Sequence, residues 1–135
     1  MKEDYVSFEV AKLLKEKGFD ADTEHDMWYV VEKFSTGCHW NSCTYKVGDI
    51  TREYDEKCCI TMPTLQMAMK WLREVHNNNI VLDMIPEGDD CYVLWTFNIL
   101  SNKNYKIMWG NKQPKYNTYE EACEAAIKYC LTNLI

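Results

Sequence analysis

The sequence predicts an α+β fold in which three helices pack on one face of an antiparallel sheet of about five strands. Three segments repeat apolar residues at spacings of three and four, which is the period of an amphipathic helix. The segments between them are rich in aromatic and β-branched residues, and two of them alternate apolar positions as strands do. The predicted order is helix, two strands, helix, three strands and helix, which favours helices gathered on one side of a sheet.

The length and composition are those of one folded domain spanning residues 1–135. Hydrophobic residues make up 47% of the 135 residues, which excludes a disordered chain. The formal net charge is −6. A protein that binds along a phosphate backbone needs clustered Lys and Arg, because the phosphates are negatively charged. The charge therefore disfavours nucleic acid as a partner.

Targeting features and cysteine usage suggest a cytoplasmic protein. The first ten residues, MKEDYVSFEV, carry charges where a signal peptide has its apolar core. No apolar run is long enough for a membrane span, so we expect no membrane association. The seven cysteines are odd in number and lack the spacing of a disulfide framework, which predicts reduced thiols.

The first helix is predicted over residues 7–17. Ser7 is a suitable N-cap, because its hydroxyl can accept from a backbone N–H of the first turn. Gly18 occupies the position where a left-handed residue ends a helix, and Phe19 can fold back onto Leu14.

Two strands are predicted next, over residues 27–34 and 38–47, and a turn at residues 35–37 makes them a hairpin. Residues 58–61 form a short extended piece that leads into the central helix.

The central helix begins after Pro63, because a proline disfavours helical dihedrals in the residue before it. Thr64 is its expected cap, and the asparagines at residues 77–79 end it, since Asn tolerates the left-handed conformation. Its predicted buried face consists of Leu65, Ala68, Met69, Leu72 and Val75.

Three strands are predicted in the second half of the chain, over residues 80–85, 91–100 and 105–109. The middle strand is the clearest, and its alternating face consists of Cys91, Val93, Trp95, Phe97 and Ile99.

The last helix is predicted to open at Thr118, with Glu121 at capping-box spacing. Its expected buried face consists of Tyr119, Ala122, Cys123, Ala126, Ile127, Cys130 and Leu134.

Three stretches resemble a group of short uncharacterised proteins found in phages and prophages of gut bacteria. They are YVSFEVAKLLKEKGF (5–19), TMPTLQMAMKWLREVHN (61–77) and YEEACEAAIKYCLTNLI (119–135). The group has a similar Pro-Thr and Trp-Leu-Arg-Glu helix, followed by strands and a Tyr-Glu-Glu-Ala helix. The resemblance implies an accessory protein of a mobile element and assigns no reaction and no catalytic residue.

The strongest candidates for a metal site are Cys38, His39, Cys43 and Cys58. Thiolate and imidazole are the ligands that zinc prefers, and Cys59 could replace Cys58. Their spacing matches no zinc motif, and buried free cysteines commonly act as small hydrophobic residues. We therefore expect no metal and no cofactor, and a small zinc-stabilised domain is kept as an alternative.

Catalytic residues are not expected. A nucleophilic thiol requires a base within hydrogen-bonding reach, and the seven thiols and three histidines show no such pairing in the sequence. Phosphate-loop, dinucleotide-binding and serine-hydrolase signatures are also absent from the sequence.

Single-stranded nucleic acid binding is the second alternative, because aromatic side chains on a sheet can stack on bases. The aromatic candidates are Trp28, Tyr29, Trp40, Tyr45, Tyr92, Trp95 and Trp109. The lysines predicted near them are Lys103, Lys106, Lys112 and Lys115. The acidic net charge and the need for aromatic residues in the core oppose this interpretation.

The sequence is most typical of a non-enzymatic interaction protein that binds a protein partner or a second copy of itself. This hypothesis follows from an aromatic-rich, ordered fold without a catalytic motif, since exposed apolar surface commonly marks an interaction site. The expected partner-binding residues are Trp28, Trp40, Tyr92, Tyr105 and Trp109.

Overall fold

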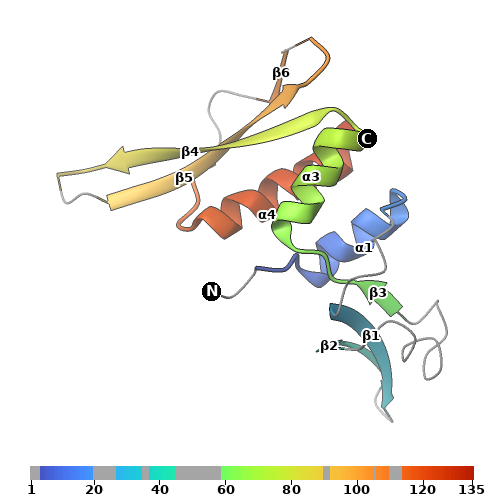
Figure 1. Cartoon of the computed structure of the whole chain (residues 1–135). Helices are drawn as coiled ribbons and strands as arrows, with labels where there is room; N and C mark the ends of the chain where they lie inside the picture. The colour runs from blue at the N-terminus through green and yellow to red at the C-terminus, as the bar shows by residue number, and fades with distance from the viewer. Residues whose placement is uncertain are drawn as a thin grey trace. The chain divides into compact units, whose positions relative to one another are not determined.

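The structure of the chain is a computed structural model, which describes residues 4–19, 27–34, 37–44, 59–89, 92–104, 106–109 and 114–135. It divides the chain into two compact units, Met1–Thr64 and Leu65–Ile135, and each is described by itself (Figure 1). That residues 1–135 form a single domain stays a prediction.

The first unit begins with helix α1 (Phe8–Glu16), and both of its ends form as the sequence predicts. The Ser7 side chain accepts a hydrogen bond from the backbone N–H of Val10. Gly18 takes a φ of 85°, and the N–H of Phe19 donates to the carbonyl of Leu14 at 2.9 Å. This is the hydrogen-bond pattern of a Schellman motif, in which a left-handed residue lets the chain reverse over the last turn.

The first unit also holds an antiparallel sheet with the strand order β2-β1-β3. Strands β1 (Met27–Phe34) and β2 (Gly37–Thr44) form the predicted hairpin. Strand β3 (Cys59–Thr61) pairs with the other edge of β1, so the expected extended piece is a true strand. The segment before α1 is hydrogen-bonded to the segment after β3, because the N–H of Val6 donates to the carbonyl of Pro63.

The second unit begins with helix α3 (Leu65–Val75), directly after Pro63 and Thr64 as expected. Four of the five residues of the predicted buried face are buried, namely Leu65, Ala68, Met69 and Leu72. The prediction for Val75 was wrong, because its side chain is 58% exposed in the last turn. The chain leaves the helix at Asn77, whose φ of 59° is the left-handed conformation predicted for this position.

The sheet of the second unit has the order β4-β5-β6 and is antiparallel. Strands β4 (Asn78–Glu87) and β5 (Tyr92–Ser101) are each ten residues long, and β6 (Ile107–Trp109) is short. Strand β4 extends through Pro86 and Glu87, two residues beyond the predicted end at residue 85. Beyond β6, Tyr116 exchanges two backbone hydrogen bonds with Trp95, so a second short segment lines the same edge of β5.

The chain ends in helix α4 (Tyr119–Tyr129), which continues as the π-helical turn η2 (Cys130–Leu134). The Thr118 hydroxyl accepts from the N–H of Glu121 at 3.1 Å, as predicted. The Glu121 carboxylate accepts from the N–H of Asn117 at 3.2 Å, one residue before the cap. The capping box therefore forms with its returning bond shifted by one residue.

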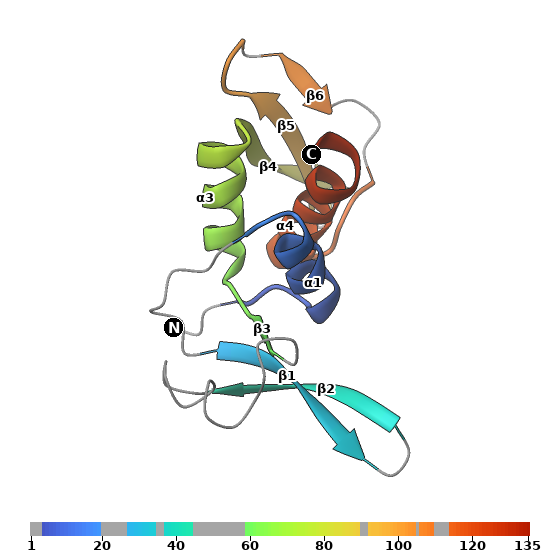
Figure 2. The same cartoon turned by 90° about the vertical axis from the view of Figure 1, so that its right-hand side faces the viewer.

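Helices α3 and α4 cover one face of the β4–β5 hairpin, and the free end of the hairpin extends past them (Figure 1). Figure 2 shows the two helices from a direction turned by 90°. The core between the helices and the strands comprises Leu72, Ile80, Phe97, Ile99, Ala122, Cys123, Ala126, Ile127, Cys130 and Leu131.

The α+β class and the antiparallel pairing are confirmed, and the predicted joining of about five strands in one sheet was wrong for the described strands. The described strands form two three-stranded sheets, one in each unit, where a single sheet of about five strands was expected. Helices α3 and α4 cover the β4–β5 hairpin within the second unit, and helix α1 belongs to the first unit. The local period of a strand indicates which side is buried, but it does not specify which strand lies alongside, and this explains the error.

The Leu72→Ala substitution is expected to lower the free energy of unfolding by about 2–5 kcal/mol, because it leaves a cavity in place of a fully buried side chain. The matched Val75→Ala substitution, three residues along the same helix, is expected to change it by about 0.5 kcal/mol or less, since Val75 is exposed. Urea unfolding followed by circular dichroism measures both values. Equal losses for the two variants would contradict the observed face of α3.

Candidate protein-interaction surface

The β4–β5 hairpin has one face that changes from buried to exposed along its length. Residues directly opposite each other on paired strands lie on the same face. The pairs of the helix-covered face are Ile80 with Ile99, Leu82 with Phe97, Met84 with Trp95, and Pro86 with Val93. Ile80 and Ile99 are buried, Leu82 and Trp95 are half-buried, and Met84 is 63% exposed. The helices therefore cover only the end of this face nearest to the start of β4.

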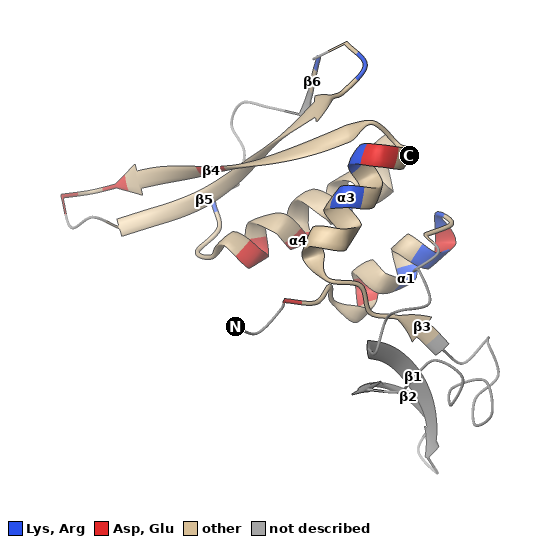
Figure 3. Ribbon diagram, viewed as in Figure 1, with Lys and Arg blue, Asp and Glu red and all other residues tan. Residues whose placement is uncertain are grey.

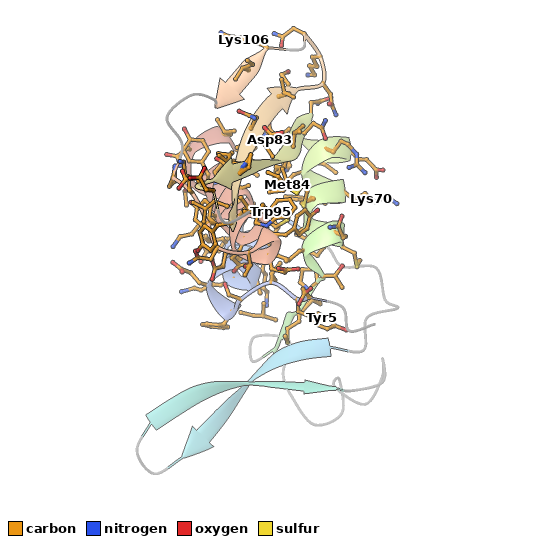
Figure 4. The ribbon with its side chains drawn as sticks, turned by 90° about the vertical axis from the view of Figure 1, so that its left-hand side faces the viewer. Tyr5, Lys70, Asp83, Met84, Trp95 and Lys106 are labelled. Carbon is orange, nitrogen blue, oxygen red and sulfur yellow. The ribbon has the colours of Figure 1, made fainter. Side chains whose placement is uncertain are left out.

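The uncovered end of this face carries three adjacent exposed apolar residues: Met84, Pro86 and Val93. Val93 is 38% exposed, and Pro86 is exposed directly opposite it. We call these three residues the bare hairpin face. Figure 4 shows Met84 together with its cross-strand neighbour Trp95. Both strands hold the three side chains on regular, paired backbone, so the surface is built on a rigid element.

An aromatic cluster, which consists of Trp95, Phe97, Tyr116 and Tyr119, lies between the bare hairpin face and the core. The rings of Trp95 and Tyr119 meet edge to face at 5.2 Å between centroids, and Phe97 stacks on Tyr116 at 6.2 Å. Such pairs contribute about 0.5–1.5 kcal/mol beyond their buried area. The amide Nε2 of Gln66 donates to the Tyr119 hydroxyl at 3.3 Å, which links the first turns of α3 and α4. Trp95 is thus fixed in position beside Met84.

The opposite face of the hairpin is bridged by polar interactions. Lys115 forms an ion pair with Glu87, and the Tyr92 hydroxyl donates to the amide oxygen of Asn117. The Asn98 side chain donates to the Asp83 carboxylate near the middle of the strands. This polar pair interrupts the apolar residues of that face, all of which are half-buried: Val81, Ile85, Leu94 and Leu100. The bare hairpin face is therefore the more continuous apolar surface of the two.

Two thiols of α4 and η2 are described, and neither is set up as a nucleophile. Burial raises the pKa of the Cys123 thiol to about 11 and that of Cys130 to about 12. A hydrogen bond with Tyr119 lowers the pKa of Cys123 by less than burial raises it. Thiolate is the reactive form of cysteine, so these two side chains act as small apolar core residues.

The structure places the predicted metal ligands Cys38, His39 and Cys43 in β2 and describes the backbone of that strand. The fourth, Cys58, lies outside the described residues, and its neighbour Cys59 is in β3. Strand β1 lies between β2 and β3, so Cys59 and the three β2 residues are on strands about 9.6 Å apart. Among the side chains that the structure does describe, no three of His, Cys, Asp or Glu gather as a metal site would require.

The predicted partner-binding residues fall in different parts of the chain. The backbone of Trp28 lies in β1, that of Trp40 in β2 and that of Trp109 in β6, while Tyr105 lies outside the described residues. Tyr92 is 54% exposed at the start of β5, next to the bare hairpin face but on the opposite side of the sheet.

Met84 and Pro86 were not among the predicted site residues, and Val93 was predicted only as one member of the alternating face of its strand. The exposure of these residues could have been predicted from the length of the strands relative to the helices. A buried row of residues at spacing two identifies a covered face only as far as the covering helices extend. The ten-residue strands are longer than the eleven-residue helices, because a helix rises less than half as far per residue as a strand. A comparison of the predicted lengths would therefore have indicated that part of the strand face is uncovered.

Comparisons with models of protein families, with curated proteins and with solved structures gave no match. Within the described ranges, no helix has both the length and the apolar composition needed to cross a bilayer.

Native protein treated with iodoacetamide at about pH 8 is expected to remain unmodified at Cys123 and Cys130, because a raised pKa and burial both suppress the thiolate. Both residues should become modified once the chain is unfolded in urea. Peptide mapping by mass spectrometry reads each cysteine separately. Rapid modification of either one in the native protein would contradict its buried position.

Proposed function

We propose that this protein is a non-enzymatic interaction module that binds a protein partner through the bare hairpin face. The observation that carries the proposal is the exposure of Met84, Pro86 and Val93 as one paired apolar set at the end of a hairpin. Contiguous exposed apolar residues with polar surroundings are typical of protein–protein interaction sites. A rigid, centrally placed apolar anchor contributes a large share of the binding energy in such sites.

The aromatic cluster supports the same proposal. Its rings are engaged with one another, so Trp95 and Tyr116 are not free to stack on nucleic-acid bases. Lys115, one of the lysines expected to accompany base stacking, is paired with Glu87. These contacts favour a protein partner over single-stranded nucleic acid. The partner is either a different protein or a second copy of this chain.

The biological setting that we propose is the cytoplasm of a bacterium carrying a phage or prophage, with this chain as an accessory protein. The support is the resemblance of residues 5–19, 61–77 and 119–135 to proteins of such elements, together with the odd number of cysteines. No cofactor and no catalytic step form part of the proposal.

Replacing the central anchor is expected to remove binding without unfolding the protein. We predict that Met84→Asp weakens partner retention about tenfold or more, because it puts a charge in the middle of the apolar contact. The measurement is quantitative capture of binding proteins from infected or lysogenic bacterial cells, comparing the wild type and the variant side by side in mass-spectrometric intensity.

Ile107→Asp is the matched control, since Ile107 is also a strand residue and is 59% exposed. It should retain the partner as the wild type does. Sedimentation of the purified wild-type protein shows whether the partner is a second copy. A set of captured proteins that is the same for Met84→Asp and Ile107→Asp, with monomeric wild-type protein, would refute the proposal.

A further inference from the structure

Acidic residues lie at both ends of the bare hairpin face, in the hairpin turn and at the start of α4. The sequence from 83 to 98 contains four acidic residues and no Lys or Arg. Asp83 and Glu87 belong to the opposite face, and Asp89 lies in the turn at the free end of the hairpin. The first turn of α4 adds Glu120 and Glu121, directly after the tyrosine that packs on Trp95. Figure 3 shows these acidic positions on the hairpin and on α4.

Basic residues of the same unit lie elsewhere. Lys115, which lies beside β5, is paired with Glu87 on the opposite face of the hairpin. Lys70 and Arg73 are on α3, and Lys103 and Lys106 are in the turn between β5 and β6. That turn is joined to the end of α3 by a hydrogen bond from the Asn102 side chain to the Arg73 carbonyl. In Figure 4, Lys70 and Lys106 project away from Met84 and Trp95.

We propose that the bare hairpin face binds a basic amphipathic helix of a partner protein. This inference rests on the proposed function and specifies the chemistry of its partner. The apolar stripe of the incoming helix would cover Met84, Pro86 and Val93. Its flanking Lys and Arg would face Asp89 and Glu120, which gives charge complementarity at the rim.

A helix fits this surface because the same face of the hairpin is already covered by helices. Helices α3 and α4 pack on β4 and β5, and a third helix beyond the first turn of α4 would continue their layer. Apolar residues spaced three and four apart on a helix present a stripe that matches a flat sheet face.

An extended peptide added to the free edge of β4 is a poorer fit. Pro86 lacks the N–H that an added strand would need, and Asp83 is exposed on the same strand. An anionic membrane surface is also a poorer fit, because the acidic rim would be repelled by its headgroups.

The test uses two fluorescent helical peptides of about 14 residues, or four turns, with the same leucine pattern. One carries lysines and the other glutamates at the polar positions. Fluorescence anisotropy with the full-length protein at about 50 mM salt is expected to show binding of the lysine peptide at least about tenfold tighter than of the glutamate peptide. Raising the salt to about 500 mM should weaken it, because salt screens exposed charges.

Matched substitutions locate the binding. Met84→Ser should weaken binding of the lysine peptide about fivefold or more, while Ile107→Ser should leave it within about twofold. Glu120→Gln should weaken it about twofold to fivefold, while Glu74→Gln, an exposed acid on α3, should not.

The outcomes separate this inference from the proposed function. Lysine-peptide binding that is unaffected by Met84→Ser, or equal binding of both peptides, overturns the basic helix as the partner. If Met84→Asp still abolishes capture of the natural partner, the proposed function stands with a different occupant. Wild-type protein that sediments as a dimer, which Met84→Ser converts to monomer, also overturns the basic helix, in favour of self-association. If the Met84 variants still capture the natural partner and still bind the lysine peptide, both proposals are overturned.

Discussion

The strands of the second unit are longer than its helices, and this difference in length determines how much of the apolar sheet face is covered. Ten residues in a strand extend about 33 Å, whereas the eleven residues of α3 rise about 16 Å as a helix. Even α4 with η2 attached, from Tyr119 to Leu134, spans about 24 Å at most. Two such helices cannot cover a hairpin of this length, so one end of its apolar face is left in contact with solvent.

The uncovered end is ordered by contacts along the β5 edge, on the opposite face and at the boundary with the core. The backbone bonds between Tyr116 and Trp95 extend the sheet by one short segment, and the ion pair of Lys115 with Glu87 reaches across to the outer strand. At the boundary, Tyr119 packs against Trp95 and accepts a hydrogen bond from Gln66. These contacts order the hairpin without covering Met84. The result is a rigid apolar surface beside a well-packed core, an arrangement that lowers the entropic cost of binding a partner.

Local sequence signals accounted for most of the helix ends and strand positions. Ser7, Gly18, Asn77 and Thr118 act as the cap or end residues that their chemistry predicts, since each signal depends only on neighbouring backbone groups. The sheet arrangement could not be predicted in this way, because pairing joins residues far apart in the chain.

The candidate site depends on the same kind of non-local information. Val93 fits the buried row by its spacing, and Val75 fits the buried face of its helix, yet both are exposed. Val93 lies beyond the part of its face that the helices cover and Val75 lies in the last turn of α3, and the exposure of both is a property of the tertiary packing. Oxidation of methionines by hydrogen peroxide, followed residue by residue with mass spectrometry, tests this account most directly. Met84, which is 63% exposed, should oxidise many times faster than Met69, which is 8% exposed on the covered side of α3. Equal, slow oxidation of the two residues would mean that the end of the hairpin is covered, and would contradict the account.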